Sequence, residues 1–285
     1  MVLCGCSKGG SNSETPSGGD EDKQESYVYG YFPDEVKAPL VGQIFAGAYY
    51  RKVVSSSDVW TGIEGTVILP HMTFDPARVN PSKPAQYLDN PSVYMGGNMG
   101  GQETDIGMTW EVIKDDNGNV SADRKAFRPF LRRTAYGSQE KNYSNAPAES
   151  RYYWYPGEKI TMSVRVDAAG VIRFIVDGAG KHYETTYECG GYSKGSKGTF
   201  KRVNAIDQVN NEGKPAQTTK TLVEGSRWES TYLYRYVSGK DVKVPMHTGR
   251  FTDMRAPDVK YFQITHTEAD DKIGAESINI NGAGY

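Results

Sequence analysis

Short runs in which polar and apolar residues alternate recur along this chain and constrain its fold more than any other feature. The clearest run is Lys159 to Asp167, where Ile, Met or Val stands at every second position. Successive side chains of a strand point to opposite faces of a sheet, so this run predicts a strand with one buried and one solvated face. A second run, Val171 to Asp177, begins after Gly170, which can adopt the positive φ of a hairpin turn. No segment shows a long apolar repeat with the helical period of about 3.6 residues.

Similar runs follow one another at intervals of roughly 10 residues, the spacing of all-β domains. We expect further strands at Val59–Leu69, Asp105–Lys114, Ala126–Arg133, Phe200–Ile206, Ser230–Val237, Val259–Thr267 and Ser277–Ile280. Asn117-Gly118 predicts a hairpin, and the stretches Met72–Pro91 and Asp207–Gly225 are predicted loops. The glycine-rich run Gly96–Gly101 indicates a bulge or a close backbone approach. The predicted fold is all-β, with two antiparallel sheets packed as a β-sandwich or jelly roll.

The composition excludes several classes of function. The 33 Lys and Arg residues nearly balance the 35 Asp and Glu residues, which argues against a nucleic-acid-binding protein. The four histidines, His71, His182, His247 and His266, are scattered without the spacing of metal ligands, so no metal site is expected. The sequence predicts no cofactor.

The N-terminal run Val2-Leu3-Cys4-Gly5-Cys6 resembles the lipobox of exported bacterial lipoproteins, in which a Leu and two small residues precede the lipidated cysteine. The resemblance implies that Cys6 is acylated and anchors the chain in a lipid bilayer of the cell envelope, at the outer membrane or cell surface. A location on the periplasmic side of the membrane is the alternative. The alternative is an incidental pair of cysteines in a frayed terminus. No stretch of about 18 apolar residues follows, so no spanning helix is predicted.

The chain divides into three parts on this interpretation. Residues 1–6 are the remnant of a lipoprotein signal and its lipobox. Residues 7–26 contain Gly, Ser, Pro and acids but no aromatic or large aliphatic residue, which predicts a disordered tether. Residues 27–285 form a single β-sandwich domain, in which Cys189 is expected to be a buried small hydrophobe. The arrangement resembles lipoproteins of the Bacteroidetes type.

Carboxylates line one side of a predicted strand. Read as a strand, the segment Tyr94–Glu111 places Glu103, Asp105 and Glu111 on the solvent side, while Ile106 and Trp110 face the core. Glycosidases built on β-sandwiches use such a row of acids, with about 5–5.5 Å between the two carboxyl groups for retention of configuration. The alternative is a solvated acidic strand face.

This segment resembles the laminarinase and lichenase type of β-glucanase, which has a concanavalin A-like sandwich. Glu103 and Asp105 match the first two acids of the family motif, the nucleophile and its supporting Asp. The acid/base position of that motif holds Gly107 in one form and Met108 in the other. The resemblance therefore implies the fold, while the proton donor of a glucanase is missing.

A second resemblance concerns the glutamic peptidases (eqolisins), which are also β-sandwiches. The run Trp60–Gly65 is similar to their Trp-x-Gly-Ile-Asp-Gly, with Glu64 at the acidic position, and Tyr153–Pro156 resembles their Glu-Trp-Tyr-Pro. The family's catalytic Ala-Glu-Trp-Ile motif is absent from this chain. The likeness implies the fold rather than peptidase activity.

Two clusters of aromatic residues are candidates for ligand binding. Flat aromatic rings stack on the C–H faces of sugars, while their polar tips form hydrogen bonds. The candidate residues are Tyr153, Trp154, Tyr232, Tyr234 and Tyr236. The alternative is that these rings form cross-strand pairs that stabilise the sheets.

These observations lead to a hypothesis of a membrane-tethered, extracytoplasmic, non-catalytic binding module for a polysaccharide or other extracellular polymer. The alternative is a hydrolase on the same fold, glycosidase-like or glutamic-peptidase-like. Its acid and base would come from Glu64, Glu103, Asp105 and Glu111. A structural surface protein without a small ligand is a third possibility.

Overall fold

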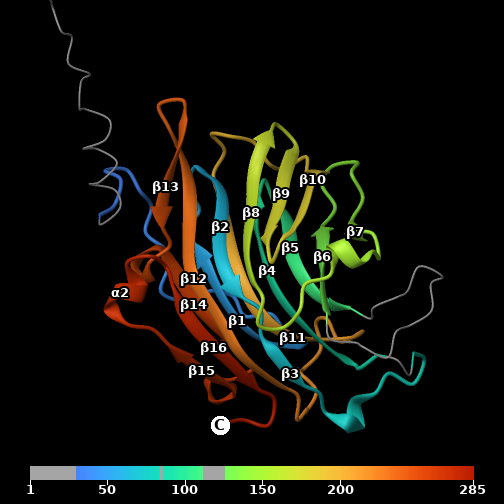
Figure 1. The fold of residues 1–285 in the computed structure, drawn as a ribbon. Helices are drawn as coiled ribbons and strands as arrows, with labels where there is room; N and C mark the ends of the chain where they lie inside the picture. The colour runs from blue at the N-terminus through green and yellow to red at the C-terminus, as the bar shows by residue number, and fades with distance from the viewer. Residues whose placement is uncertain (1–29, 84–85, 112–125) are drawn as a thin grey trace, which may run out of the picture.

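The computed structural model describes residues 30–83, 86–111 and 126–285, and almost all of its regular structure is β-strand (Figure 1). The strands are β1 (Ala48–Ser55), β2 (Trp60–Ile68), β3 (His71–Thr73), β4 (Asp89–Met99), β5 (Gln102–Glu111), β6 (Ala126–Arg133), β7 (Asn142–Asn145), β8 (Lys159–Ala168), β9 (Val171–Gly178), β10 (Lys181–Glu188), β11 (Gly198–Gln208), β12 (Leu222–Val237), β13 (Lys240–Pro245), β14 (Phe251–Ala256), β15 (Phe262–Thr265) and β16 (Glu276–Asn281). A single short helix, α2 (Glu268–Asp271), and four 3-10 turns complete the regular structure of the described residues.

The strands form two antiparallel sheets that pack face to face, which confirms the predicted sandwich (Figure 1). The seven-stranded sheet has the order β14-β1-β11-β4-β5-β6-β7. The nine-stranded sheet has the order β10-β9-β8-β2-β12-β16-β15, and β13 and β3 also pair with β12. Many neighbours in the sheets are far apart in sequence, so the order of the strands cannot be derived from local pattern alone.

The alternating residues of the predicted strands meet between the two sheets. Met162 and Val164 of β8 and Ile106 and Met108 of β5 belong to one buried cluster. Each of these side chains is removed from water on every side, which stabilises the fold through the hydrophobic effect. The predicted alternation therefore identifies the core correctly.

A charged group also lies between the sheets. Glu276 of β16 accepts hydrogen bonds from Arg51 of β1 at 3.0 Å and from Arg202 of β11 at 2.6 Å. All three side chains are buried. Burial alone would raise the pKa of the Glu276 carboxyl, but the two guanidinium groups lower it to about 2. The carboxylate therefore ties the two sheets together as an ion.

Most predicted strands are confirmed, and one is wrong in part. The predicted strand Val259–Thr267 is strand only at Phe262–Thr265, because Val259–Tyr261 forms a 3-10 turn whose N-cap, Asp258, accepts a hydrogen bond from the Lys260 backbone N–H. The predicted loops Met72–Pro91 and Asp207–Gly225 overlap the ends of strands. The strands that the sequence pattern did not indicate are β1, β3, β4, β7, β10, β13 and β14.

Two of the predicted features lie outside the described residues. They are the Asn117-Gly118 hairpin and the whole N-terminal part, with the lipobox cysteine Cys6 and the tether. The turn at Gly170 is confirmed, with a φ of 76°. Within the described ranges, no helix is long and apolar enough to cross a membrane.

Candidate functional site

Three of the predicted site residues come together on the outer face of the nine-stranded sheet. Glu64 of β2 lies opposite Tyr232 of β12, and Tyr234 is the next outward residue along β12. The Tyr234 hydroxyl donates a hydrogen bond to Glu64 Oε2 at 2.7 Å, and Lys243 Nζ lies 2.6 Å from Glu64 Oε1. Both carboxylate oxygens are therefore occupied. We call this surface, with Arg165, the Glu64 face.

Gly62 makes room for a contact at the centre of the Glu64 face. It lies between Arg165 of β8 and Tyr234 of β12 in one row across the sheet. A Cβ at Gly62 would come within 2.8 Å of Arg165 Cγ. Without that atom, the Arg165 guanidinium lies 3.9 Å from the centroid of the Tyr234 ring. Arg165 packs on the Tyr234 ring through this cation–π contact, and Tyr234 is only 7% exposed.

Each of the three predicted tyrosines of β12 has a cation over its ring. Lys243 lies over Tyr232 at 4.4 Å, and Lys194 lies over Tyr236 at 5.8 Å, in addition to the contact at Tyr234. A sugar would have to displace the cation to stack on the same ring face. The Glu64 face consequently offers ammonium, guanidinium and hydroxyl groups rather than bare rings. The prediction that these three rings are available to stack on a sugar is corrected, because a cation already lies over each ring.

A hollow of about 270 Å³ adjoins the Glu64 face. It is lined by Ser163, Arg165, Val166, Asp167, Arg173, Ile175, Lys194 and Asp241. Lys194 Nζ and Asp241 Oδ2 are 3.0 Å apart within it. The volume is close to the lower end, about 300 Å³, of the range of ligand pockets. Its polar lining contains both hydrogen-bond donors and acceptors.

Glu103 and Asp105 lie on the outer face of the other sheet. The Lys201 ammonium of β11 contacts Glu103 Oε1 and lies 2.7 Å from Asp105 Oδ1. Lys201 reaches Asp105 over Gly96 of β4, which lies between them in the register. Lys52 Nζ is 3.9 Å from Glu103 Oε1. We call these four charged residues the Lys201 cluster.

The Lys201 cluster keeps its carboxylates ionised. Burial would raise the pKa values of Glu103 and Asp105, but the charge of Lys201 outweighs it and lowers both. Burial and the neighbouring Lys201 lower the pKa of Lys52 to about 8. The Lys201 side chain itself is only 5% exposed. Neither predicted carboxyl is therefore suited to donate a proton near neutral pH.

The place of the missing glucanase acid is filled by packing. A Cβ at Gly107 would lie 2.4 Å from Tyr94 Cα, and Met108 is buried in the core. A carboxyl with a raised pKa comes instead from Asp207 of β11, at about 6. Burial is the main cause, opposed by a 2.5 Å hydrogen bond from Ser92, and the negative charge of Asp105 adds to the rise. Sequence reasoning missed Asp207 because only the sheet order brings it near Asp105.

Two of the predicted ligand-binding residues are part of the core. Trp154 is fully buried and donates a hydrogen bond from Nε1 to the Gly178 carbonyl at 3.0 Å, and Tyr153 is buried beside it. The prediction that these two rings face a ligand is wrong, because an aromatic run satisfies a core as well as a binding surface. The side chain of Glu111 lies outside the described part of the structure.

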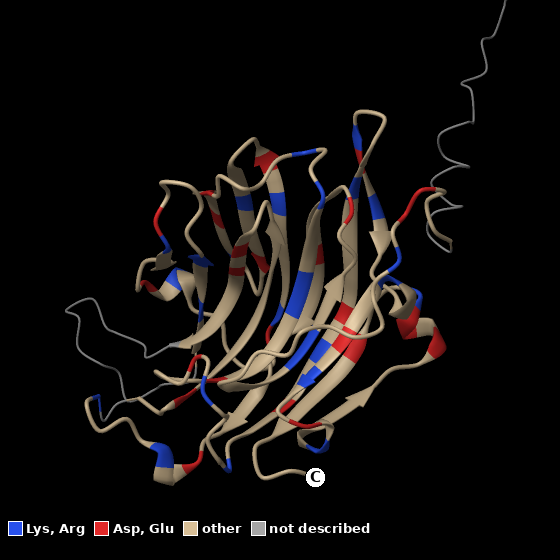
Figure 2. Cartoon of the chain, turned by 180° about the vertical axis from the view of Figure 1, so that it is seen from behind, with Lys and Arg blue, Asp and Glu red and all other residues tan. Residues whose placement is uncertain are grey.

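Other reactive groups do not add to these sites. Cys189 is buried as predicted, and burial raises the pKa of its thiol to about 12. Among the described residues, no group of three or more His, Cys, Asp or Glu side chains is placed to hold a metal ion. Figure 2 shows basic and acidic positions interspersed along the strands.

Comparison with known proteins finds structural likeness only. No protein-family model matches the chain, and no curated protein sequence matches it either. A scytalido-glutamic peptidase with a peptide-based transition state analog has a TM-score of 0.44 at 9% identity, over 82% of this chain and 98% of the peptidase. A Bacteroides ovatus mixed linkage glucan GH16 protein has a TM-score of 0.34 at 14% identity, over 68% of this chain and 81% of that protein. The alginate lyase from Klebsiella pneumoniae has a TM-score of 0.37 at 11% identity, over 70% of this chain and 60% of the lyase.

Proposed function

We propose that this protein binds a polysaccharide or another extracellular polymer on the Glu64 face. The observation that carries the proposal is the convergence of Glu64, Tyr232 and Tyr234, predicted from two separate motifs, beside a polar hollow of about 270 Å³. A sheet face that is open at its sides lets a long chain pass across it, whereas a closed pocket would admit only an end.

The polar groups of the Glu64 face suit a ligand rich in hydroxyl groups. Arg165, Arg173 and Lys194 supply donors around the hollow, while Asp167 and Asp241 supply acceptors. Each sugar hydroxyl can both donate and accept, so this mixed lining can pair with it from either side. The site is nearly balanced in charge, which favours a ligand recognised by hydrogen bonds rather than by net charge.

A binding experiment tests the proposal with matched variants. Native affinity gels with a panel of soluble neutral and uronic-acid polysaccharides identify a polymer that retards the protein. Glu64→Gln and Tyr232→Ala should remove that retardation. Tyr143→Ala, at an exposed tyrosine of β7 in the other sheet, should retain it. Retardation that survives both Glu64-face variants contradicts the proposal.

We further propose that the domain is tethered in the cell envelope through an acylated Cys6. The lipobox-like run and the composition of residues 7–26 support this. Labelling of growing cells with an alkyne-tagged fatty acid should mark the protein. The label should be lost in Cys6→Ser and kept in Cys4→Ser. Equal labelling of the two variants would contradict the assignment of Cys6.

A hydrolase is the second candidate, and the opposed pKa shifts of Asp105 and Asp207 favour it. In this mechanism Asp207 donates its proton to the leaving oxygen as the glycosidic C–O bond breaks. Asp105 accepts a proton from the attacking water, whose oxygen forms the new bond to carbon. Release of reducing ends that is lost in Asp207→Asn and in Asp105→Asn would establish this activity. Binding without any release would leave the binding function alone.

A further inference from the structure

Residues 31–45, which we call the strap, wrap around the edge strand β14 of the seven-stranded sheet. The Tyr31 hydroxyl donates a hydrogen bond to the Gly249 carbonyl at 3.0 Å, just before β14. Farther along, the Pro39 carbonyl accepts a hydrogen bond from Thr252 Oγ1. The strap makes these contacts without joining the sheet as a strand.

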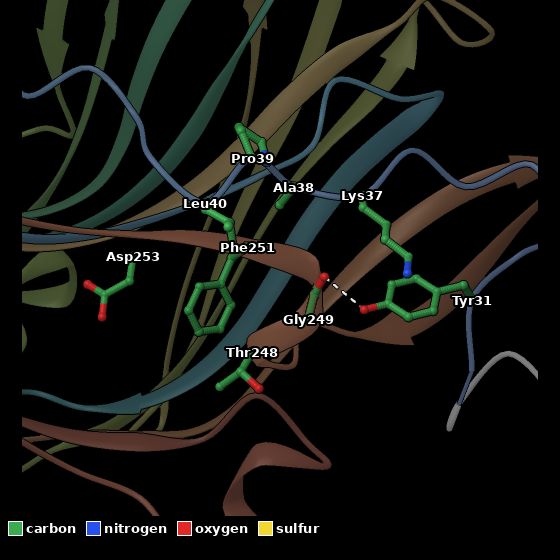
Figure 3. A pocket seen from close by; sticks show the side chains of 9 residues that line it. All are labelled: Tyr31, Lys37, Ala38, Pro39, Leu40, Thr248, Gly249, Phe251 and Asp253. Atoms are coloured by element: carbon green, nitrogen blue, oxygen red, sulfur yellow. Dashed lines mark hydrogen bonds between the residues drawn. The ribbon is translucent and has the colours of Figure 1, made fainter.

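A hollow of about 470 Å³ lies between the strap and β14. Figure 3 shows Phe251 and Leu40 in its middle, with Asp253 on one side and Lys37 on the other. The volume falls within the range of about 300–1,000 Å³ for pockets that hold ligands. Its centre is apolar and its two ends carry Lys37 and Asp253. Asp253 also pairs with Arg51 at 2.6 Å and with Arg255 at 2.8 Å, and Lys37 Nζ lies 5.1 Å from the centroid of the Tyr31 ring.

The tip of the strap exposes two aliphatic side chains, Leu40, which lines this hollow, and Val41, which follows it in the chain. Leu40 is 96% exposed and Val41 is 84% exposed, the highest fractions among large hydrophobic residues of the described chain. Ile44 and Phe45 are also exposed. Contiguous exposed apolar residues of this kind mark a contact surface rather than an ordinary loop.

The neighbouring backbone indicates that the contact is with protein. Within the described residues, the backbone of Phe251–Ala256 forms ladder bonds only with β1, so the groups on its other side are open to a partner. A lipid bilayer cannot satisfy such groups, whereas another polypeptide can. The exposed strap and the edge strand are therefore better suited to a protein than to a membrane.

We propose that the partner is a second copy of this chain, with Leu40 and Val41 of each copy entering the hollow of the other. The protruding residues and the hollow lie side by side on one surface, which is what a two-fold symmetric interface requires. The same two-fold axis brings Lys37 of one copy toward Asp253 of the other. No second surface is needed to close the dimer.

Sedimentation velocity of the full chain, under reducing conditions that prevent disulfides through Cys4 or Cys6, tests this directly. The wild type should form dimers in a concentration-dependent way. The double variant Leu40→Asp, Val41→Asp should weaken the dimer about tenfold or more, since it places charges in an apolar contact. Val259→Asp, at a residue 60% exposed and outside the strap, should dimerise like the wild type.

Hydrogen exchange locates the interface independently of any variant. Amides of Phe251–Ala256 should exchange more slowly as the dimer population rises. A chain that stays monomeric up to about 1 mM, or a dimer unaffected by the Leu40 and Val41 changes, overturns the proposal. So does a monomer that sediments with lipid vesicles through the same two residues.

Discussion

Replacing Glu276 with Gln removes one negative charge from the interior of the sandwich and leaves two guanidinium groups facing it. Arg51 and Arg202 are each no more than 3% exposed, and Glu276 bonds to both. Arg51 retains Asp253, but Arg202 keeps no other carboxylate within ion-pair distance among the described residues. Removing one partner of a buried ion pair costs about 3–5 kcal/mol. The pKa of Glu276 gives an interaction free energy of similar size, because a fall from 4.5 to about 2 corresponds to roughly 3 kcal/mol.

The pH dependence follows from the direction of that shift. The folded state lowers the pKa of Glu276, so its contribution is complete above the unfolded value of 4.5 and is lost as the pH falls toward about 2. Glu276→Gln should therefore be less stable than the wild type by about 3 kcal/mol at pH 7. At pH 3 the difference should narrow by about 2 kcal/mol.

Urea unfolding at the two pH values measures both quantities. Glu224→Gln, at an exposed residue without an ion pair among the described residues, is the control and should unfold like the wild type. Equal stability of Glu276→Gln and wild type at pH 7 would refute the idea that this ion holds the sheets together. A loss that is the same at pH 3 and pH 7 would assign it to packing instead.

Three further changes probe the two outer faces. Gly62→Ala should cost about 1–3 kcal/mol, because its Cβ would lie 2.8 Å from both Arg165 Cγ and the Val164 carbonyl oxygen, and should weaken polymer retardation in affinity gels. Lys201→Met removes the main cation of Glu103 and Asp105, leaving them Lys52 at 3.9 Å and Arg132 at 3.4 Å, and should cost about 1.5–3 kcal/mol in urea unfolding. Asp207→Asn should stabilise the protein at pH 8 but not at pH 4. The fold raises the pKa of Asp207 to about 6, so its charged form destabilises the folded state above that pH. A urea midpoint that changes equally at both pH values would contradict this.

The sequence predicts the sandwich because alternation is a local property. Ile160, Met162 and Val164 identify the buried face of β8 without knowledge of any other strand. Aromatic runs are less informative, since Trp154 completes the core whereas Tyr232, in a similar run, reaches the surface. What separates them is the position of each residue relative to the opposite sheet, which no local pattern contains.

The candidate sites depend on glycines whose role becomes visible only with the strand order. Gly62 separates Arg165 from Tyr234, and Gly96 separates Lys201 from Asp105. In each row the middle strand presents no side chain, so a long cation from one neighbour reaches a partner on the other. The run Gly96–Gly101 indicated a close backbone approach, and a Cβ at Gly96 would indeed lie 2.0 Å from the Thr104 carbonyl oxygen.

Gly107 has the same role in a third row, between Tyr94 of β4 and Phe130 of β6. The two rings meet edge to face over it, with centroids 5.8 Å apart. In the sequence, Gly107 is the departure that removes the glucanase acid. In the structure, it is the position over which two aromatic residues pack. An acid restored there would have to separate these rings. The glycine therefore belongs to an aromatic contact on this face, and any proton donor must come from another strand.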